Sequence, residues 1–192
     1  MRNEVVLDLE TQDTFQEVGG YDPVKLHISL VGIYSYADDT YRSFLEPELP
    51  KLWKYLEQAD AIVGYNTNHF DLPILNKYYP GEIGTFFSID LMAAIEKSLG
   101  FRVKLEDVGQ ATLGRGKTGT GLQAIQFFKA RDFEKLASYC LEDVRLTKDL
   151  YEFARAHGKV MFRDRTGVVR EVPVALDAIP KKAASLNLTM PF

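Results

Sequence analysis

The fold of this chain is decided by the segment NEVVLDLETQ, residues 3–12. Its β-branched and leucine residues are typical of a strand, in which successive side chains point to opposite faces of a sheet. Val6, Asp8 and Glu10 therefore share one face, and the other face is apolar. Considered alone, two acids on one face are best explained by contact with solvent. A first strand followed by a long strand and a hairpin is, however, expected to lie centrally in its sheet, where both faces are covered.

The rest of the chain predicts an α/β fold. Residues 25–36 form a long strand that pairs with 40–46, and strands and helices alternate from there to a long helix at 132–158. This order indicates a five-stranded mixed sheet flanked by helices. We expect one domain over residues 1–158, followed by a C-terminal β-hairpin and tail over 159–192. The intervening elements are expected at 47–58, 59–66, 70–79, 85–100, 105–114 and 122–128.

The composition is that of a globular protein. The 192 residues are 46% apolar and 26% charged, and no apolar run approaches the roughly 20 residues needed to span a bilayer. No basic segment followed by a long apolar stretch marks a signal peptide. Cys140 is the single cysteine, so a disulfide within the chain is excluded and a reducing compartment fits best. We therefore expect a cytoplasmic protein that does not associate with membranes.

Charge is unevenly distributed along the chain. Residues 1–100 carry 7 Lys and Arg against 16 Asp and Glu, a net charge of −9, whereas residues 101–192 carry 16 against 11, a net charge of +5. Ordinary solvated surface explains this asymmetry by itself. The asymmetry also permits a polyanionic partner, with cations neutralising the acidic half while the basic half contacts phosphates.

Two further polar clusters accompany the first strand. YNTNHFDL, residues 65–72, follows a short buried strand and begins a helix, where Asn and Asp are common as caps. SYCLEDVRL, residues 138–146, lies on the long helix and places Tyr139 and Asp143 on one helix face. Each cluster has an ordinary explanation when it is considered alone: helix capping for Asp71, and an amphipathic helix for Asp143.

Taken together, the acids of these three segments predict a metal site. Each lies where a strand end or a helix face can bring it to one point, and four carboxylates at one point repel unless cations lie among them. Mg²⁺ and Mn²⁺ prefer such oxygen ligands. Two of these ions about 3.5–4 Å apart can hold the attacking and leaving oxygens of a phosphodiester. We therefore expect two divalent cations, Mg²⁺ or Mn²⁺, held by Asp8, Glu10, Asp71 and Asp143.

Three short motifs occur in order: D-L-E at 8–10, N-x-x-x-F-D at 66–71 and Y-x-x-x-D at 139–143. Together they resemble the exonuclease motifs of the DEDD superfamily of 3′–5′ exonucleases, which have an RNase H-like fold. The resemblance covers about residues 3–155. Because the third motif begins with Tyr139, the chain is most similar to the tyrosine subgroup, which includes the proofreading exonuclease domains of DNA polymerases and several stand-alone nucleases.

The resemblance implies a role for each residue of the motifs. Asp8 would bridge both metals. Glu10 and Asp143 would complete the shell of the first metal, and Asp71 would hold the second. Tyr139 would orient the attacking water, which in this family attacks the terminal phosphodiester in line and releases a nucleoside monophosphate. A strong side-chain base is not needed, because the metal lowers the pKa of the water.

Five further residues are candidates for substrate contacts. The resemblance implies that the backbone of Thr11 meets the 3′-terminal nucleotide, and that Asn66 supports the site or touches the substrate. Phe15 lies in the loop after the first strand and can stack on a base, although an ordinary packed aromatic explains it equally well. Arg115 and Lys117 lie in a glycine-rich loop and are interpreted as phosphate contacts, with a merely solvated loop as the alternative.

The sequence therefore predicts a metal-dependent 3′–5′ exonuclease acting on single-stranded nucleic acid with a 3′ end. Only the resemblance to proofreading domains favours DNA over RNA. An exoribonuclease or an endonuclease on the same fold is the first alternative. A non-catalytic nucleic-acid-binding module is the second, and the presence of all four acids and Tyr139 speaks against it. Proofreading would need a separate polymerase or helicase partner, and a homo-oligomer is also open.

Overall fold

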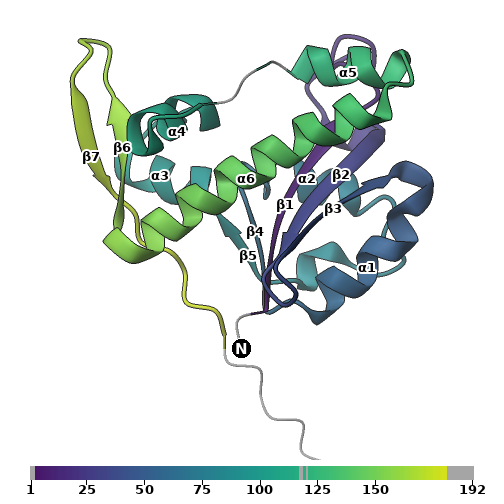
Figure 1. The fold of residues 1–192 in the computed structure, drawn as a ribbon, viewed down its shortest axis with the longest axis horizontal. Helices are drawn as coiled ribbons and strands as arrows, with labels where there is room; N and C mark the ends of the chain where they lie inside the picture. The colour runs from purple at the N-terminus through teal and green to yellow at the C-terminus, as the bar shows by residue number, and fades with distance from the viewer. Residues whose placement is uncertain (1–2, 117–118, 120, 181–192) are drawn as a thin grey trace, which may run out of the picture.

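The computed structural model describes residues 3–116, 119 and 121–180. Within them, five strands form one mixed sheet in the order β3-β2-β1-β4-β5 (Figure 1), which confirms the predicted sheet. The strands are β1 (Glu4–Thr11), β2 (Ile28–Ser35), β3 (Thr40–Leu45), β4 (Ala61–Gly64) and β5 (Ser88–Asp90).

β1 is the central strand of this sheet. It pairs antiparallel with β2 along its length and parallel with β4 only over Glu4, Val5 and Val6. β2 continues antiparallel to β3, and β4 continues parallel to β5. Because β4 ends at Gly64, the second half of β1 has a neighbouring strand on one side only, among the residues described. That half carries Asp8 and Glu10.

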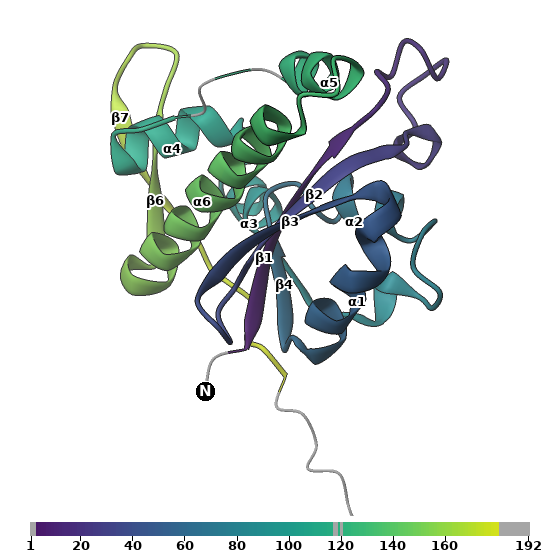
Figure 2. The same ribbon diagram turned by 45° about the vertical axis from the view of Figure 1, so that its right-hand side comes forward.

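Helices cover both faces of the sheet, and Figure 2 shows α1 and α6 on opposite sides of the strands. One face packs against α1 and α2 through the odd-numbered apolar residues of β1, which are Val5, Leu7 and Leu9. The other face packs against the remaining helices. The helices are α1 (Leu49–Gln58), α2 (Asp71–Leu75), α3 (Leu91–Leu99), α4 (Leu105–Leu113), α5 (Gly121–Lys129) and α6 (Phe133–His157).

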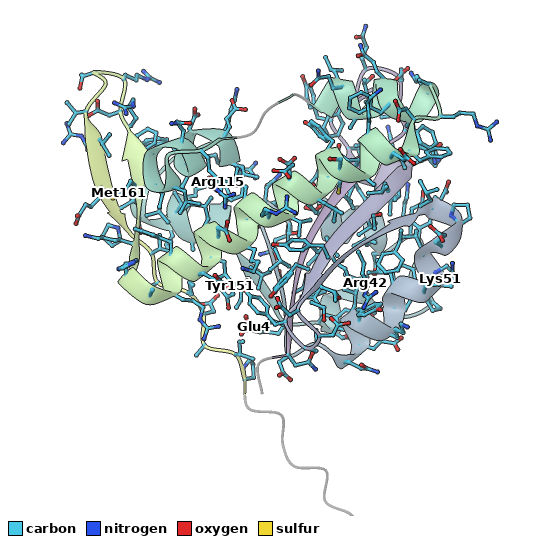
Figure 3. The ribbon with its side chains drawn as sticks, in the orientation of Figure 1. Glu4, Arg42, Lys51, Arg115, Tyr151 and Met161 are labelled. Carbon is cyan, nitrogen blue, oxygen red and sulfur yellow. The ribbon has the colours of Figure 1, made fainter. Side chains whose placement is uncertain are left out.

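The even-numbered residues of β1 face α6, which runs antiparallel to the strand. At the start of β1, buried Glu4 accepts a 3.0 Å hydrogen bond from Arg155, near the end of α6. Arg155 also donates a 3.4 Å hydrogen bond to the hydroxyl of Tyr151, one turn earlier on α6; Glu4 and Tyr151 are labelled in Figure 3. Val6 follows in the apolar core shared with α6. Further along β1, the carbonyl and carboxylate of Asp8 meet the thiol of Cys140. One helix therefore follows β1 from its first residue to its acids.

The C-terminal hairpin is present, as predicted, and forms a separate two-stranded sheet of β6 (Lys159–Arg163) and β7 (Val169–Pro173). It packs on α4: the hydroxyl of Thr112 accepts a hydrogen bond from the N–H of Met161 (2.9 Å) and donates one to its carbonyl (3.2 Å). Thr112 therefore closes the outer edge of β6 at this residue. The predicted tail from residue 181 onward lies outside the described residues.

The helix predicted over 70–79 is shorter in the structure, where α2 ends at Leu75. The residues after it continue in turns, with the N–H groups of Tyr78 and Tyr79 both bonded to the carbonyl of Leu75. Among the described residues, no helix has both the length and the apolar character that crossing a membrane requires.

Candidate active site

Four carboxylates from three elements line one pocket of about 420 Å³. Asp8 and Glu10 project from β1, Asp71 begins α2, and Asp143 lies near the middle of α6. Three of them are buried, and Asp8 is half-buried. Acids that are far apart in the sequence therefore share one concave site at the end of β1 that β4 does not cover.

A glycine allows α6 to approach the acids of β1. Gly32 of β2 is the ladder partner of Asp8. A Cβ at this position would lie 2.8 Å from the sulfur of Cys140 and 3.1 Å from Cγ2 of Val144, closer than side chains pack. Because both neighbours flank Asp143 on α6, the missing side chain of Gly32 is what lets the helix carry Asp143 toward Asp8.

Asp71 takes the place of a strand partner beside β1. Its Oδ1 accepts a 3.1 Å hydrogen bond from the backbone N–H of Leu9, and its Oδ2 accepts one of 3.1 Å from the hydroxyl of Thr67. Thr67 packs closely on the end of β4, since a Cβ on Gly64 would lie 2.4 Å from its oxygen. The end of β4 at Gly64 therefore leaves the N–H of Leu9 available and also makes room for Thr67.

Asp90 holds the loop that leads into Asp71. It ends β5 and caps α3, and its buried carboxylate accepts hydrogen bonds from the N–H groups of Asn66 (2.9 Å), Asn68 (3.0 Å) and Ala93 (3.2 Å). Asn66 has a left-handed backbone with φ of 65°, which such hydrogen bonds help to hold. The sequence gives no signal for this role of Asp90, because an Asp between a strand and a helix indicates only a helix cap.

Burial dominates the electrostatics of the pocket. It raises the pKa of Asp71 to about 7; the charge of Asp90 acts in the same direction, and the hydrogen bonds from Thr67 and Leu9 oppose the shift. Burial also raises the pKa of the Cys140 thiol well above its usual value, with further contributions from Asp8, Glu10 and Asp143. The carboxylates therefore lie close enough to affect the same thiol, and that thiol stays protonated near neutral pH.

The donor atoms of the pocket fit hard divalent cations. Single ligand atoms of Asp8, Glu10 and Cys140 lie within 4.8 Å of one another. Because the thiol stays protonated, the available donors are carboxylate oxygens, which Mg²⁺ and Mn²⁺ prefer and which differ from the nitrogen and sulfur ligands typical of zinc. Cations among these acids would also relieve their mutual repulsion.

Two predicted substrate contacts line the pocket. Thr11 is one of them, and its hydroxyl donates a 2.9 Å hydrogen bond to the carbonyl of Asp13, which holds this side chain against the segment after β1. The ring of Phe15 meets Phe70, which also lines the pocket, edge to face with centroids 6.2 Å apart. A β-bulge between Glu10 and Thr11 shifts the register here, a feature that re-aims side chains near functional sites.

Three other predicted residues, all within the described part of the chain, do not line this pocket: Tyr139, Asn66 and Arg115. The half-buried ring of Tyr139 packs against Phe127 of α5, with centroids 6.4 Å apart. The side-chain oxygen of Asn66 accepts a hydrogen bond from Arg102. Arg115 forms an ion pair with Asp149 and lies beside α4 in Figure 3. Lys117 lies outside the described residues.

The walls of the pocket include residues that the sequence does not mark as functional. Leu122 and Ile125 line it from α5, and Leu122 is 62% exposed. Tyr65 lines it from the loop after β4, but its hydroxyl donates a 2.8 Å hydrogen bond to the carbonyl of Val103, and burial raises its pKa. Nothing in the sequence pattern of α5 distinguishes a helix that borders a pocket from one that covers a core.

Comparisons with known proteins agree with this architecture. The chain is similar to the family B DNA polymerase from the hyperthermophilic archaeon Pyrobaculum calidifontis, with a TM-score of 0.61 and 17% sequence identity. The similarity covers 81% of this chain but only 25% of the polymerase chain. No curated protein matches the chain. A model of the RNase H superfamily matches residues 5–155, from β1 to the last turns of α6. The chain therefore belongs to the RNase H superfamily.

Proposed function

We propose that this protein is a metal-dependent 3′–5′ exonuclease that shortens single-stranded nucleic acid, with DNA as the preferred substrate. The observation that carries the proposal is the meeting of Asp8, Glu10, Asp71 and Asp143 in one pocket of an RNase H-like fold. Their segments occur in the order that the DEDD exonuclease motifs have. The RNase H superfamily as a whole supports a nuclease, and the three motifs support a 3′–5′ exonuclease in particular.

The four acids divide into two groups by what surrounds them. Asp8, Glu10 and Asp143 lie around the thiol of Cys140, between β1 and α6, and we assign them to one cation. Asp71 approaches from the edge of β1 that β4 leaves uncovered, and we assign it, with Asp8, to the second cation. Bound cations would supply an activated water and neutralise charge on the leaving oxygen.

Neighbouring groups of the chain orient this chemistry. The N–H of Leu9 and the hydroxyl of Thr67 fix the carboxylate plane of Asp71. Tyr139 precedes Asp143 by one helical turn, and the motif supports a role in orienting the attacking water. Thr11 borders the pocket beside Glu10, and the motif resemblance supports a contact between its backbone and the terminal nucleotide.

The walls of the pocket favour an unpaired base. Phe15 and Phe70 offer aromatic rings beside the acids, and Leu122 adds apolar surface; single-stranded nucleic acids are commonly bound by stacking of bases on aromatic side chains. The preference for DNA is supported by the motif resemblance to proofreading domains and by the structural likeness to a DNA polymerase. Since the chain spans a quarter of that polymerase, only this one activity is proposed.

Product analysis tests the proposal. Matched single-stranded DNA and RNA oligonucleotides labelled at the 5′ end are incubated with the protein and Mg²⁺ or Mn²⁺. We expect stepwise shortening that EDTA abolishes, with DNA shortened faster than RNA. A single internal cut would instead indicate an endonuclease, and binding without cleavage would indicate a non-catalytic module.

Two variants of α6 form a matched pair for this test. Asp143→Asn removes a buried acid of the pocket, and activity is expected to fall by at least about 100-fold. Glu142→Gln removes the preceding acid, which is 57% exposed and paired with Arg145, and activity is expected to change little. Equal activity of the two variants would refute the site assignment.

A further inference from the structure

Three aromatic rings lead from the pocket to the surface of the protein. Phe70 and Phe15 line the pocket. The ring of Tyr21 continues the series, with its centroid 5.2 Å from that of Phe15 and an interplanar angle of 40°. Tyr21 is 92% exposed. The outermost ring therefore has one neighbour on the pocket side and is otherwise open to solvent.

The loop that carries Tyr21 is held in place on both sides of this residue. The N–H of Gly20 donates a 2.9 Å hydrogen bond to the carbonyl of Phe15, and the N–H of Asp22 donates one of 2.9 Å to the carbonyl of Gly20. An ion pair of 2.7 Å joins Glu17 to Lys129 at the end of α5. The exposed ring is therefore presented by a braced loop.

The charge of this loop determines which part of a nucleotide it suits. Residues 12–27 include the acids Asp13, Glu17 and Asp22 but only one lysine, Lys25. Such a surface does not attract phosphates, whereas an open aromatic ring binds any base through its face. An incoming strand is therefore expected to turn its bases, rather than its backbone, toward this loop.

We propose that Tyr21 is a stacking platform for the base that precedes the 3′-terminal nucleotide, an assignment that rests on the exonuclease function proposed above. The terminal nucleotide occupies the pocket beside Phe15 and Phe70, over the acids. The strand that enters the pocket then passes the outer ring of the series. Tyr21 therefore binds the second base from the 3′ end, which a substrate with an abasic residue at that position lacks.

Kinetics on substrates with and without the second base test this assignment. The measured quantity is the ratio of kcat/KM for a single-stranded oligodeoxynucleotide to kcat/KM for the same oligonucleotide with an abasic residue at the second position from the 3′ end, both with Mn²⁺. We expect Tyr21→Ala to lower this ratio by about 5- to 150-fold, the range of one base–aromatic stack. Tyr21→Phe keeps the ring and is expected to restore the ratio.

An exposed aromatic on another part of the surface provides the control. Phe101 is 48% exposed and contacts Phe162 of the hairpin, with centroids 5.7 Å apart. We expect Phe101→Ala to leave the ratio at the wild-type value. If Tyr21→Ala and Phe101→Ala give the same ratio, or if Tyr21→Leu restores the ratio as well as Tyr21→Phe does, stacking by Tyr21 is excluded.

A binding measurement separates this inference from the proposed function. The Asp8→Asn protein is titrated with oligodeoxynucleotides that carry the fluorescent base 2-aminopurine at either the second or the sixth position from the 3′ end. We expect quenching at the second position only, and its loss on adding Tyr21→Ala. Quenching by a wild-type protein that cleaves nothing would support the platform and refute the exonuclease. Cleavage without quenching, or no binding at all, would overturn the platform.

Discussion

The carboxylate of Asp71 accepts a 3.1 Å hydrogen bond from the backbone N–H of Leu9. Leu9 is the residue between Asp8 and Glu10, so the start of α2 is bonded to β1 at the point where these two acids project. Its side chain is buried on the opposite face, in the core beneath α1 and α2. The relative placement of three of the four acids therefore depends on backbone geometry and core packing rather than on flexible side chains.

Replacing Asp71 should separate its structural role from its chemical role. Asp71→Asn keeps an oxygen for the N–H of Leu9, and its amide can donate to Thr67. Because a buried negative charge is also removed, we expect the free energy of unfolding at pH 8 to equal or exceed that of the wild type. Asp71→Ala leaves the N–H of Leu9 unsatisfied and should cost about 1–3 kcal/mol. Urea denaturation in EDTA measures both, and an equal loss for the two variants would contradict this account.

The raised pKa of Asp71 predicts a pH dependence of stability. Because the folded pKa of about 7 lies above the usual value of 3.8, the folded protein binds this proton more tightly than the unfolded chain does. The contribution is fully present below pH 3.8 and is lost as the pH rises toward 7. Unfolding free energies of wild type and Asp71→Asn in EDTA should therefore diverge over this window, with the steeper fall in the wild type. Parallel curves would show that Asp71 has an ordinary pKa.

The affinity for cations should rise with pH, whereas the contribution of Asp71 to stability falls. A metal ion requires the ionised carboxylate and so competes with the proton on Asp71. We expect the apparent affinity for Mn²⁺, measured by calorimetry on the wild type, to rise between pH 6 and 8. In Asp71→Asn the rise should be smaller, since this proton is no longer displaced. A rise of the same size in both proteins would assign the released proton to another group.

The acids could be located from the sequence because strand alternation and helix periodicity place them on defined faces. Asp8 and Glu10 share a face in any strand, and Asp143 follows Tyr139 by one turn in any helix. Their approach depends on tertiary contacts that leave no periodic signal. Gly32 permits the helix to come close, and Asp90 holds a loop through backbone N–H groups, which every sequence possesses.

The loops were harder to predict than the sheet. Arg115 is a cation in a glycine-rich loop, and its assignment as a phosphate contact stays a prediction; the structure adds an ion pair with Asp149, which the sequence did not indicate. Such pairing depends on where α4 and α6 meet, and sequence spacing does not encode that distance. The sequence around Tyr21 gives no signal either, because the role proposed above depends on the position of this ring beside Phe15 and not on its local sequence.

Asp90 should support activity without touching the substrate. Asp90→Ala removes the acceptor for three backbone N–H groups, two of them in the loop before Asp71. We expect a loss of about 2–4 kcal/mol in stability and a fall in kcat larger than any change in KM. Asp90→Asn retains one acceptor oxygen and should recover part of kcat.

A second helix cap serves as the control for Asp90. Asp132 caps α6 by accepting a hydrogen bond from the N–H of Lys135. Asp132→Ala should cost about 1 kcal/mol and leave kcat near the wild-type value. If Asp90→Ala lowers stability but leaves kcat unchanged, as we expect for Asp132→Ala, then Asp90 is an ordinary helix cap and does not position Asp71.

The contact between Gly32 and Cys140 should control the approach of α6 to β1. In Gly32→Ala the new methyl group meets the sulfur of Cys140 at 2.8 Å and Val144 at 3.1 Å, so we expect a loss of about 1–3 kcal/mol from overpacking. Cys140→Ala removes a buried sulfur and should cost about 1 kcal/mol. Because the smaller side chain makes room for the new methyl group, the double variant should be more stable than the sum of the two single effects predicts.

Cleavage should fall in Gly32→Ala, since the displaced helix moves Asp143 away from Asp8, and should recover partly in the double variant. Cys140→Ala alone should keep its cleavage activity, because a protonated thiol is not a ligand of the cations. Strict additivity in urea denaturation, or loss of cleavage in Cys140→Ala, would contradict this account of the site.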